Sequence, residues 1–192
     1  LKRPPPSLSS RTPRPEAFLG KLECFPQSME SPFYPAVRML RGFAGVPEGM
    51  EAETAYPILL SYVRSLSLAE EQSAVALLGS FFSLPPHPDF PLPNLPSAGL
   101  REETAKLLLS ILKARSLKGR VLFVIEDLHW TDASTGDLFR RILSDPVFTK
   151  SVFFLLTTRT GEDPPWLATL PERVTLRLSP LGEEESRESG PV

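Results

Sequence analysis

Two adjacent carboxylates in this sequence have the position that magnesium-dependent phosphate chemistry requires. Glu126 and Asp127 directly follow five apolar residues, 121–125, which are typical of a buried strand. Such a pair at the mouth of a strand can hold a hydrated magnesium ion and orient a water molecule for attack on a phosphate. The ordinary alternative is that one carboxylate caps a turn and the other is solvated, and the strand and the acids alone leave both open.

A second polar group follows the next apolar run, 151–157. Thr157, Thr158 and Arg159 stand at its end. A guanidinium beside the acids could contact a terminal phosphate through a planar pair of donors. The alternative is a loop arginine paired with Glu162 or Asp163. Because parallel α/β sheets bind ligands at the carboxyl ends of their strands, two polar strand ends favour a site more than either alone.

A transition-metal site is the less favoured interpretation of the same region. Its ligands would have to come from Glu126, Asp127, His129 and Asp132, which are neighbours on one turn. The only other histidine, His87, lies in a proline-rich stretch. Neighbours on a single turn rarely surround a metal. We therefore expect His129 and the adjacent Trp130 to pack beneath the acids, where the indole N–H needs a partner.

The elements around these residues predict a three-layer α/β fold. Strands 121–125 and 151–157 flank a helix that begins at Asp132 or Ser134, which makes a right-handed βαβ unit. Because residues 121–125 are apolar without alternation, that strand is expected to be covered on both faces. We also expect a short strand at 17–25, a more exposed strand at 173–178, and helices at 33–43, 54–66, 68–82 and 97–117, the last capped by Ser97.

Composition excludes several classes of protein. The 192 residues carry a net charge of −2 and one cysteine, and they contain no apolar run long enough to cross a bilayer. A disulfide framework, a multi-cysteine zinc site and a membrane span are thus not expected, and cytoplasm is the expected location. Of the 22 prolines, clusters fall in 1–15, read as a disordered basic leader, and in 84–96, read as an extended connection.

The string VLFVIEDLHWTDAST, residues 121–135, closely resembles the Walker B segment of signal-transduction ATPases with numerous domains. These STAND proteins contain AAA-like modules that accompany bacterial nucleotidyl cyclases and LuxR-type regulators. Three other segments resemble the family in the same order: 24–35, 152–161 and 176–181. The resemblance covers roughly 17–187 and implies a P-loop-NTPase-like parallel sheet.

The resemblance also implies roles for individual residues. Glu126 would coordinate Mg²⁺ through water and Asp127 would orient the attacking water, or the reverse, because the family pattern varies here. Arg159 would sense the γ-phosphate of ATP, with Thr158 beside it. Asp132 would cap the following helix.

The chain departs from the family where ATP phosphates should be cradled. It contains no GxxxxGK[ST] motif, and Gly20-Lys21 lacks both the glycine loop and the following hydroxyl residue. The position of that motif is taken by LKRPPPSLSSRTPRPE. Since the family's sheet order is 5-1-4-3-2, the missing first strand is a central one, and its two neighbours would lack a partner.

We therefore expect a leader at 1–15, a partial ATPase core at 16–178 that includes the 84–96 connection, and the start of a helical subdomain at 179–192. The expected function is that of a fragment of an ATP- and Mg²⁺-binding signalling module, inactive alone, that regulates an attached cyclase or DNA-binding output domain. The alternative is a non-catalytic scaffold with a degenerate nucleotide site. Nucleic-acid binding through the leader is disfavoured, no membrane partner is expected, and homo-oligomerisation is left open.

Overall fold

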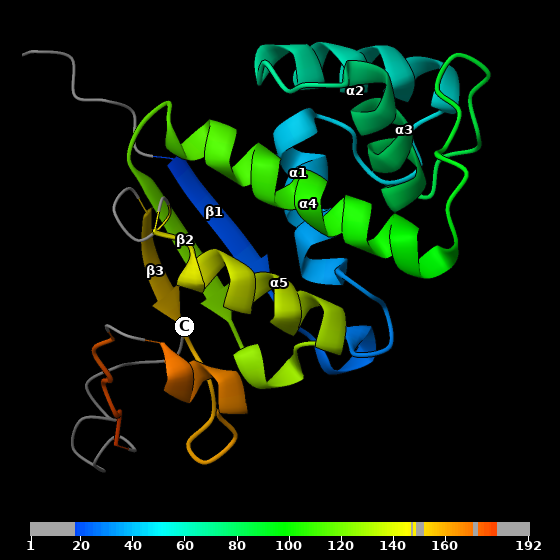
Figure 1. The fold of residues 1–192 in the computed structure, drawn as a ribbon. Helices are drawn as coiled ribbons and strands as arrows, with labels where there is room; N and C mark the ends of the chain where they lie inside the picture. Colours follow the sequence, from blue (N-terminus) through cyan, green and yellow to red (C-terminus); the bar gives the residue numbers. More distant parts are fainter. Residues whose placement is uncertain (1–17, 147, 149–151, 171–172, 180–192) are drawn as a thin grey trace, which may run out of the picture.

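A computed structural model of the chain describes residues 18–146, 148, 152–170 and 173–179. Within these ranges the fold is α/β (Figure 1). The strands are β1 (Phe18–Glu23), β2 (Val121–Glu126) and β3 (Val152–Leu156). The α-helices are α1 (Tyr34–Ala44), α2 (Ala52–Ser65), α3 (Glu71–Phe81), α4 (Ser97–Ser116) and α5 (Ala133–Ser144). Short 3₁₀ helices are η1 (Pro26–Ser28), η2 (Leu128–Trp130) and η3 (Pro165–Thr169).

The three strands form one parallel sheet in the order β1-β2-β3. In its register, Leu22 lies opposite Ile125, and Ile125 lies opposite Leu156. The strands expected at 17–25, 121–125 and 151–157 are thus confirmed as β1, β2 and β3, although β1 ends at Glu23, β2 extends to Glu126 and β3 ends at Leu156. The expected leader at 1–15, and 180–192 of the expected subdomain at 179–192, lie outside them.

The helices that contact the sheet lie on one of its faces (Figure 1). Sheet residues such as Phe123 and Ile125 meet Met39 of α1, Leu108 of α4 and Phe139 of α5 around an apolar cavity of about 20 Å³. Because β1, β2 and β3 follow one another in the same direction, right-handed crossovers place their helices on the same side. The expected third layer is absent from the described residues.

The expected burial of β2 on both faces is wrong for the same reason. Its side chains alternate between buried and half-buried, and the buried ones (Val121, Phe123 and Ile125) face the helices. An unbroken apolar run does not by itself reveal whether a second helical layer is present.

The proline-rich connection, 84–96, contains no helix or strand, as expected, and it packs against α2. The ring of Tyr56 on α2 stacks on Phe90 with centroids 5.6 Å apart, and its hydroxyl donates to the carbonyl oxygen of Pro85 at 2.9 Å. The connection therefore follows the outer helices, α2 and α3, which lie beyond α1 and α4 from the sheet (Figure 1).

Of the two expected helix caps, Asp132 is confirmed and Ser97 is wrong. Asp132 caps α5, because its carboxylate accepts from the backbone N–H groups of Ser134 at 2.9 Å and Thr135 at 3.0 Å. Ser97 does not cap α4. It is the first helical residue, and Pro96 holds the capping position without a side-chain hydrogen bond.

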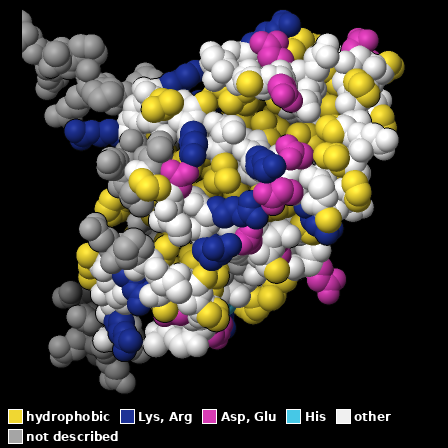
Figure 2. Space-filling view, viewed as in Figure 1, with side chains coloured by type: hydrophobic (Ala, Val, Ile, Leu, Met, Phe, Trp, Pro, Cys, Tyr) yellow, Lys and Arg dark blue, Asp and Glu magenta, His cyan; other side chains and the backbone are white. Residues whose placement is uncertain are grey.

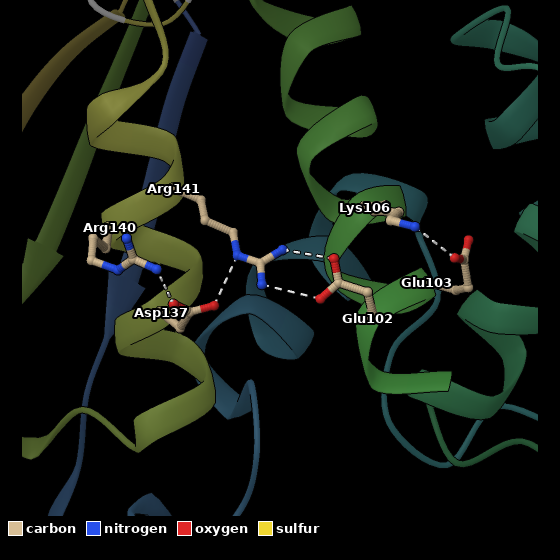
Figure 3. Close-up of polar contacts among 6 residues, drawn as sticks. All are labelled: Glu102, Glu103, Lys106, Asp137, Arg140 and Arg141. Carbon is tan, nitrogen blue, oxygen red and sulfur yellow. Dashed lines mark hydrogen bonds and ion pairs between the residues drawn. The ribbon is translucent and has the colours of Figure 1, made fainter. Parts of the chain in front are cut away.

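A charged network connects α4 to α5 (Figure 3). The Arg141 guanidinium donates to both carboxylate oxygens of Glu102, at 2.9 and 3.0 Å, and to Asp137 at 2.8 Å. Figure 2 shows basic and acidic side chains side by side over these two helices. Planar two-point pairing of this kind fixes the geometry between the helices more than single-point contacts do.

The strand expected at 173–178 is not formed. Residues 173–179 have no regular secondary structure, and Val174, Leu176 and Leu178 are 89%, 81% and 92% exposed. An alternating apolar pattern becomes a strand only when a neighbouring backbone pairs with it. In the described residues no strand lies beside it.

No helix of the described residues is both long and apolar enough to cross a membrane.

Candidate functional site

The ends of β2 and β3 are joined by hydrogen bonds at the carboxyl edge of the sheet. Thr157 N–H donates to the carbonyl oxygen of Ile125 at 2.9 Å, and Leu128 N–H donates to that of Thr157 at 2.8 Å. The backbone N–H of Asp127 donates to the Thr157 hydroxyl oxygen at 3.0 Å. The two polar groups that the sequence singled out therefore share one edge, as parallel strands require.

Asp127 lies at the sharp turn out of β2. Its backbone has φ 54° and ψ 47°, in the left-handed region that aspartate and asparagine tolerate better than most residues. The residue is exposed, and no ion pair involves it in the described part of the chain. Its carboxylate is therefore accessible to a ligand at this edge.

The carboxylate of Glu126 has a cationic partner. Lys21 on β1 lies 3.0 Å from a Glu126 oxygen and 2.7 Å from an oxygen of Glu23. Hydrogen bonds to Glu23 and then to Glu126 raise the pKa of Lys21, and the bond from Lys21 lowers the pKa of Glu23. A metal cation that binds Glu126 would have to displace Lys21 or share the Glu126 carboxylate with it.

Arg159 lies over an aromatic ring near the acids. Its guanidinium carbon is 5.8 Å from the centroid of Trp130, within cation–π range. Arg159 is exposed and its carbonyl oxygen accepts from the N–H of Glu162 at 3.1 Å in a tight turn. Among the described residues no ion pair connects Arg159 to Glu126 or Asp127. The structure thus brings its backbone to the edge without a direct contact to the acids.

Thr158 is half-buried between Thr157 and Arg159. Its hydroxyl donates to the carbonyl oxygen of Glu162 at 3.5 Å, a long hydrogen bond. This contact closes the turn after β3. A contact between Thr158 and a nucleotide stays a prediction.

The less favoured transition-metal site finds no support in the described residues, which contain no group of three or more His, Cys, Asp or Glu arranged to hold a metal. The Asp132 carboxylate accepts the hydrogen bonds that cap α5. His129 packs against Trp130 with ring centroids 4.9 Å apart, and its ring nitrogens are buried without a hydrogen-bond partner. Hydrated magnesium, which needs fewer protein ligands, is not addressed by this finding.

A cleft of about 640 Å³ lies beside the edge, between the start of α5 and the segment that leads into η3. It has an acidic lining, with Asp137, Glu162 and Asp163 against Arg140, and Trp166 at one wall. None of the four predicted site residues lines it. The cleft is therefore a neighbour of the predicted edge and does not coincide with it.

Sequence reasoning missed the roles of Lys21 and Thr157. The sequence pattern gives Lys21 no role outside a phosphate loop and gives Thr157 none beyond its place next to Thr158. The signal for Lys21 was its alternation with Leu19 and Glu23, which places the three on one face of β1. Its pairing with Glu126 also depends on the register between β1 and β2, which the sequence does not contain.

Comparison of the chain with profiles of known protein families, with curated proteins and with solved structures gives no match.

Proposed function

We propose that this chain is a partial P-loop-NTPase-like module of the STAND type, a piece of an ATP-binding signalling ATPase that regulates an attached cyclase or DNA-binding domain in the cytoplasm. The observation that supports the proposal most is the hydrogen bond between Asp127 N–H and the Thr157 hydroxyl oxygen. It joins the acidic end of β2 to the end of β3, from which Thr158 and Arg159 continue.

The donor set at this edge suits hydrated magnesium. Two adjacent carboxylates, Glu126 and Asp127, provide hard oxygen ligands, and Mg²⁺ usually keeps most of its waters while binding one or two of them. The ion, when bound, neutralises charge on the phosphates of ATP. In the proposal Asp127 orients a water, Glu126 helps to hold the ion, and Arg159 with Thr158 contacts the terminal phosphate.

The residues present do not suffice to cradle the phosphates. A nucleotide site of this class uses a run of backbone N–H groups and a lysine from a GxxxxGK[ST] loop, and the 192 residues contain no such loop. Lys21 also occupies the Glu126 carboxylate. We accordingly expect that this chain alone binds Mg²⁺–ATP weakly and does not turn it over.

The second candidate is a non-catalytic scaffold with a degenerate nucleotide site, and the Lys21–Glu126 ion pair favours it. In a scaffold this pair is a structural contact between β1 and β2, and the edge has no ligand.

Replacing Lys21 separates the two candidates. In Lys21→Met, Glu126 loses its cation, so a metal-binding edge should take up Mn²⁺, a paramagnetic substitute for Mg²⁺, several-fold more tightly by water-proton relaxation. Adding Asp127→Asn to that variant should remove the gain. The matched control is Lys106→Met, because Lys106 also pairs with a glutamate at 2.9 Å on the helical surface. Unchanged Mn²⁺ affinity in Lys21→Met would favour the scaffold.

A further inference from the structure

The cleft beside the carboxyl edge of the sheet lies apart from the predicted nucleotide residues. Its volume is about 640 Å³, and it lies between the start of α5 and residues 162–166, where η3 begins. Pockets that bind small ligands usually have volumes of about 300–1,000 Å³ and combine apolar walls with a few polar groups. This cleft is therefore large enough to bind a ligand, and the chemistry of its lining indicates which kind.

Two of the four carboxylates that line the cleft have no cationic partner. Asp132 accepts the hydrogen bonds that cap α5, and Asp137 forms an ion pair with Arg140 at 2.6 Å. Glu162 and Asp163 are exposed, and no ion pair involves either of them in the part of the chain that the structure describes. The cleft therefore has an excess of negative charge that a bound cation would neutralise.

One wall of the cleft is aromatic and apolar. Trp166 is half-buried, and its indole nitrogen lies close to α5, 3.4 Å from where a β-carbon on Gly136 would be. Pro164 and Pro165 add apolar surface beside the indole. A tryptophan ring attracts cations through its electron-rich face, more strongly where water is excluded. The ring and the uncompensated carboxylates therefore favour the same kind of ligand, an organic cation.

A histidine in the lining lacks a hydrogen-bond partner. His129 lines the cleft, both of its ring nitrogens are buried, and neither bonds to another described residue. Buried polar atoms in folded proteins nearly always have a partner, either in the protein or in a bound molecule. The unprotonated nitrogen of a neutral imidazole accepts a hydrogen bond, which an N–H donor in the cleft would supply. This observation is independent of the acids and also points to a bound donor.

Other classes of ligand fit the lining less well. A directly coordinated metal ion is disfavoured, because the described residues contain no group of three or more His, Cys, Asp or Glu that could hold one. An anion would be repelled by Glu162 and Asp163, and the first backbone N–H groups of α5 already donate to Asp132. A guanidinium is planar, weakly hydrated and rich in N–H donors, so that one group can stack on an indole and donate to carboxylates.

We propose that this cleft binds an alkylguanidinium group, the chemistry of an arginine side chain. The planar cation lies between Trp166 and the carboxylates of Glu162 and Asp163, and its apolar stem lies against Pro164 and Pro165. The proposal goes beyond the proposed function, because different residues support it and it holds whether or not the neighbouring edge binds Mg²⁺–ATP.

The test follows the indole N–H signals of the full ¹⁵N-labelled chain by nuclear magnetic resonance, without nucleotide. The sequence contains two tryptophans, and Trp166→Phe assigns the Trp166 signal by its loss. Butylguanidinium is titrated at constant ionic strength and compared with butylurea, which has nearly the same shape and no charge. The Trp166 signal should shift to saturation, with a Kd about fivefold or more lower for butylguanidinium than for butylurea.

Matched variants separate the cleft from the net charge of the chain. The double variant Glu162→Gln and Asp163→Asn should bind butylguanidinium about fivefold or more weakly. The control, Glu48→Gln with Glu51→Gln, removes the same charge from two exposed glutamates outside the cleft and should leave the affinity nearly unchanged. Asp127→Asn, at the predicted magnesium edge, should also leave it unchanged, so that failure of this proposal and failure of the proposed function are distinguishable.

The source of the guanidinium is tested with a tripeptide that carries arginine between two glycines. Tighter binding of the tripeptide than of butylguanidinium would indicate an arginine of a partner polypeptide, and equal binding would indicate a free guanidino compound. A Trp166 signal that does not move, or equal affinities for butylguanidinium and butylurea, would overturn the proposal. Full affinity in the Glu162 and Asp163 double variant, or loss of binding in Asp127→Asn, would overturn it as well.

Discussion

Asp127 and Thr157, thirty positions apart, are joined by a 3.0 Å hydrogen bond from the backbone of one to the side chain of the other. The bond lies where β2 and β3 end, beside the two backbone hydrogen bonds of Thr157 with Ile125 and Leu128, and it ties the acidic turn to the loop that carries Arg159. The arrangement makes the edge a geometric unit whose parts can be tested one at a time.

Removing the Thr157 hydroxyl should loosen this edge. In Thr157→Val the Asp127 N–H loses its acceptor, and we expect the free energy of unfolding to fall by about 0.5–1 kcal/mol in urea titrations, at the modest end because water can reach the site. Thr158→Val is the control, since the Thr158 hydroxyl makes only the long 3.5 Å bond to Glu162. Equal effects from the two variants would contradict a specific role for Thr157.

Gly20 is required by the packing of the sheet on its helices. A β-carbon at this position would lie 2.3 Å from the Phe123 ring, which stacks on Phe154 with centroids 5.7 Å apart and would have to shift. Gly20→Ala should cost about 1–3 kcal/mol of stability. By contrast, Gly42→Ala in α1 meets nothing within 4 Å and should stabilise the chain by about 0.5–1 kcal/mol. Thermal unfolding of both variants checks the pair, and a neutral Gly20→Ala would contradict a tight contact between this position and the Phe123 ring.

The Asp132 cap should be a major local contribution to α5. Asp132 is 7% exposed, and its carboxylate accepts from two backbone N–H groups of the first turn. Asp132→Ala should therefore lower stability by about 1–2 kcal/mol, while Asp132→Asn, which keeps an acceptor oxygen, should recover most of it. If asparagine is as damaging as alanine, the negative charge matters more than the cap.

The connection between α4 and α5 should give stability a pH dependence. The hydrogen bond from Arg141 lowers the pKa of Glu102, and one from Arg140 lowers the pKa of Asp137. A carboxyl with a depressed folded-state pKa stabilises the fold above its unfolded value, here 4.5 for Glu102, and the contribution disappears as pH falls through the lower folded value. Urea midpoints measured from pH 7 to pH 3 should therefore fall at the acidic end.

Glu102→Gln should flatten the acidic fall of that profile, and Glu103→Gln, beside it on α4, should leave it nearly unchanged. If both variants lose the same part of the pH dependence, that dependence originates outside the Arg141 network.

The backbone of this fold could be read from local patterns in the sequence. The apolar runs before Glu126 and Thr157 became β2 and β3, and helical periodicity predicted α5 with its start at Asp132 or Ser134; the structure assigns the cap to Asp132. Each of these signals is contained in a few consecutive residues. The cap expected at Ser97 was wrong because Pro96, one residue earlier, holds that position.

Features that depend on residues far apart in the sequence could not be predicted from such local patterns. The alternation of Val174, Leu176 and Leu178 is the same in a paired strand and in an exposed segment. The pairing of Lys21 with Glu126 requires a register between residues more than one hundred positions apart. At the candidate site, the sequence placed the two strand ends on one edge, and the orientation of Arg159 toward Trp130 came only from the structure.

Titrating the full chain with a fluorescent ATP analogue, in the presence and absence of Mg²⁺, shows whether the Asp127–Thr157 edge is the magnesium half of a nucleotide site. We expect weak binding that requires Mg²⁺, that is lost in Asp127→Asn and kept in Asp89→Asn, and that is accompanied by no turnover. Binding that ignores Mg²⁺ or survives Asp127→Asn, or ATP hydrolysis abolished by Glu126→Gln and Asp127→Asn, would contradict it.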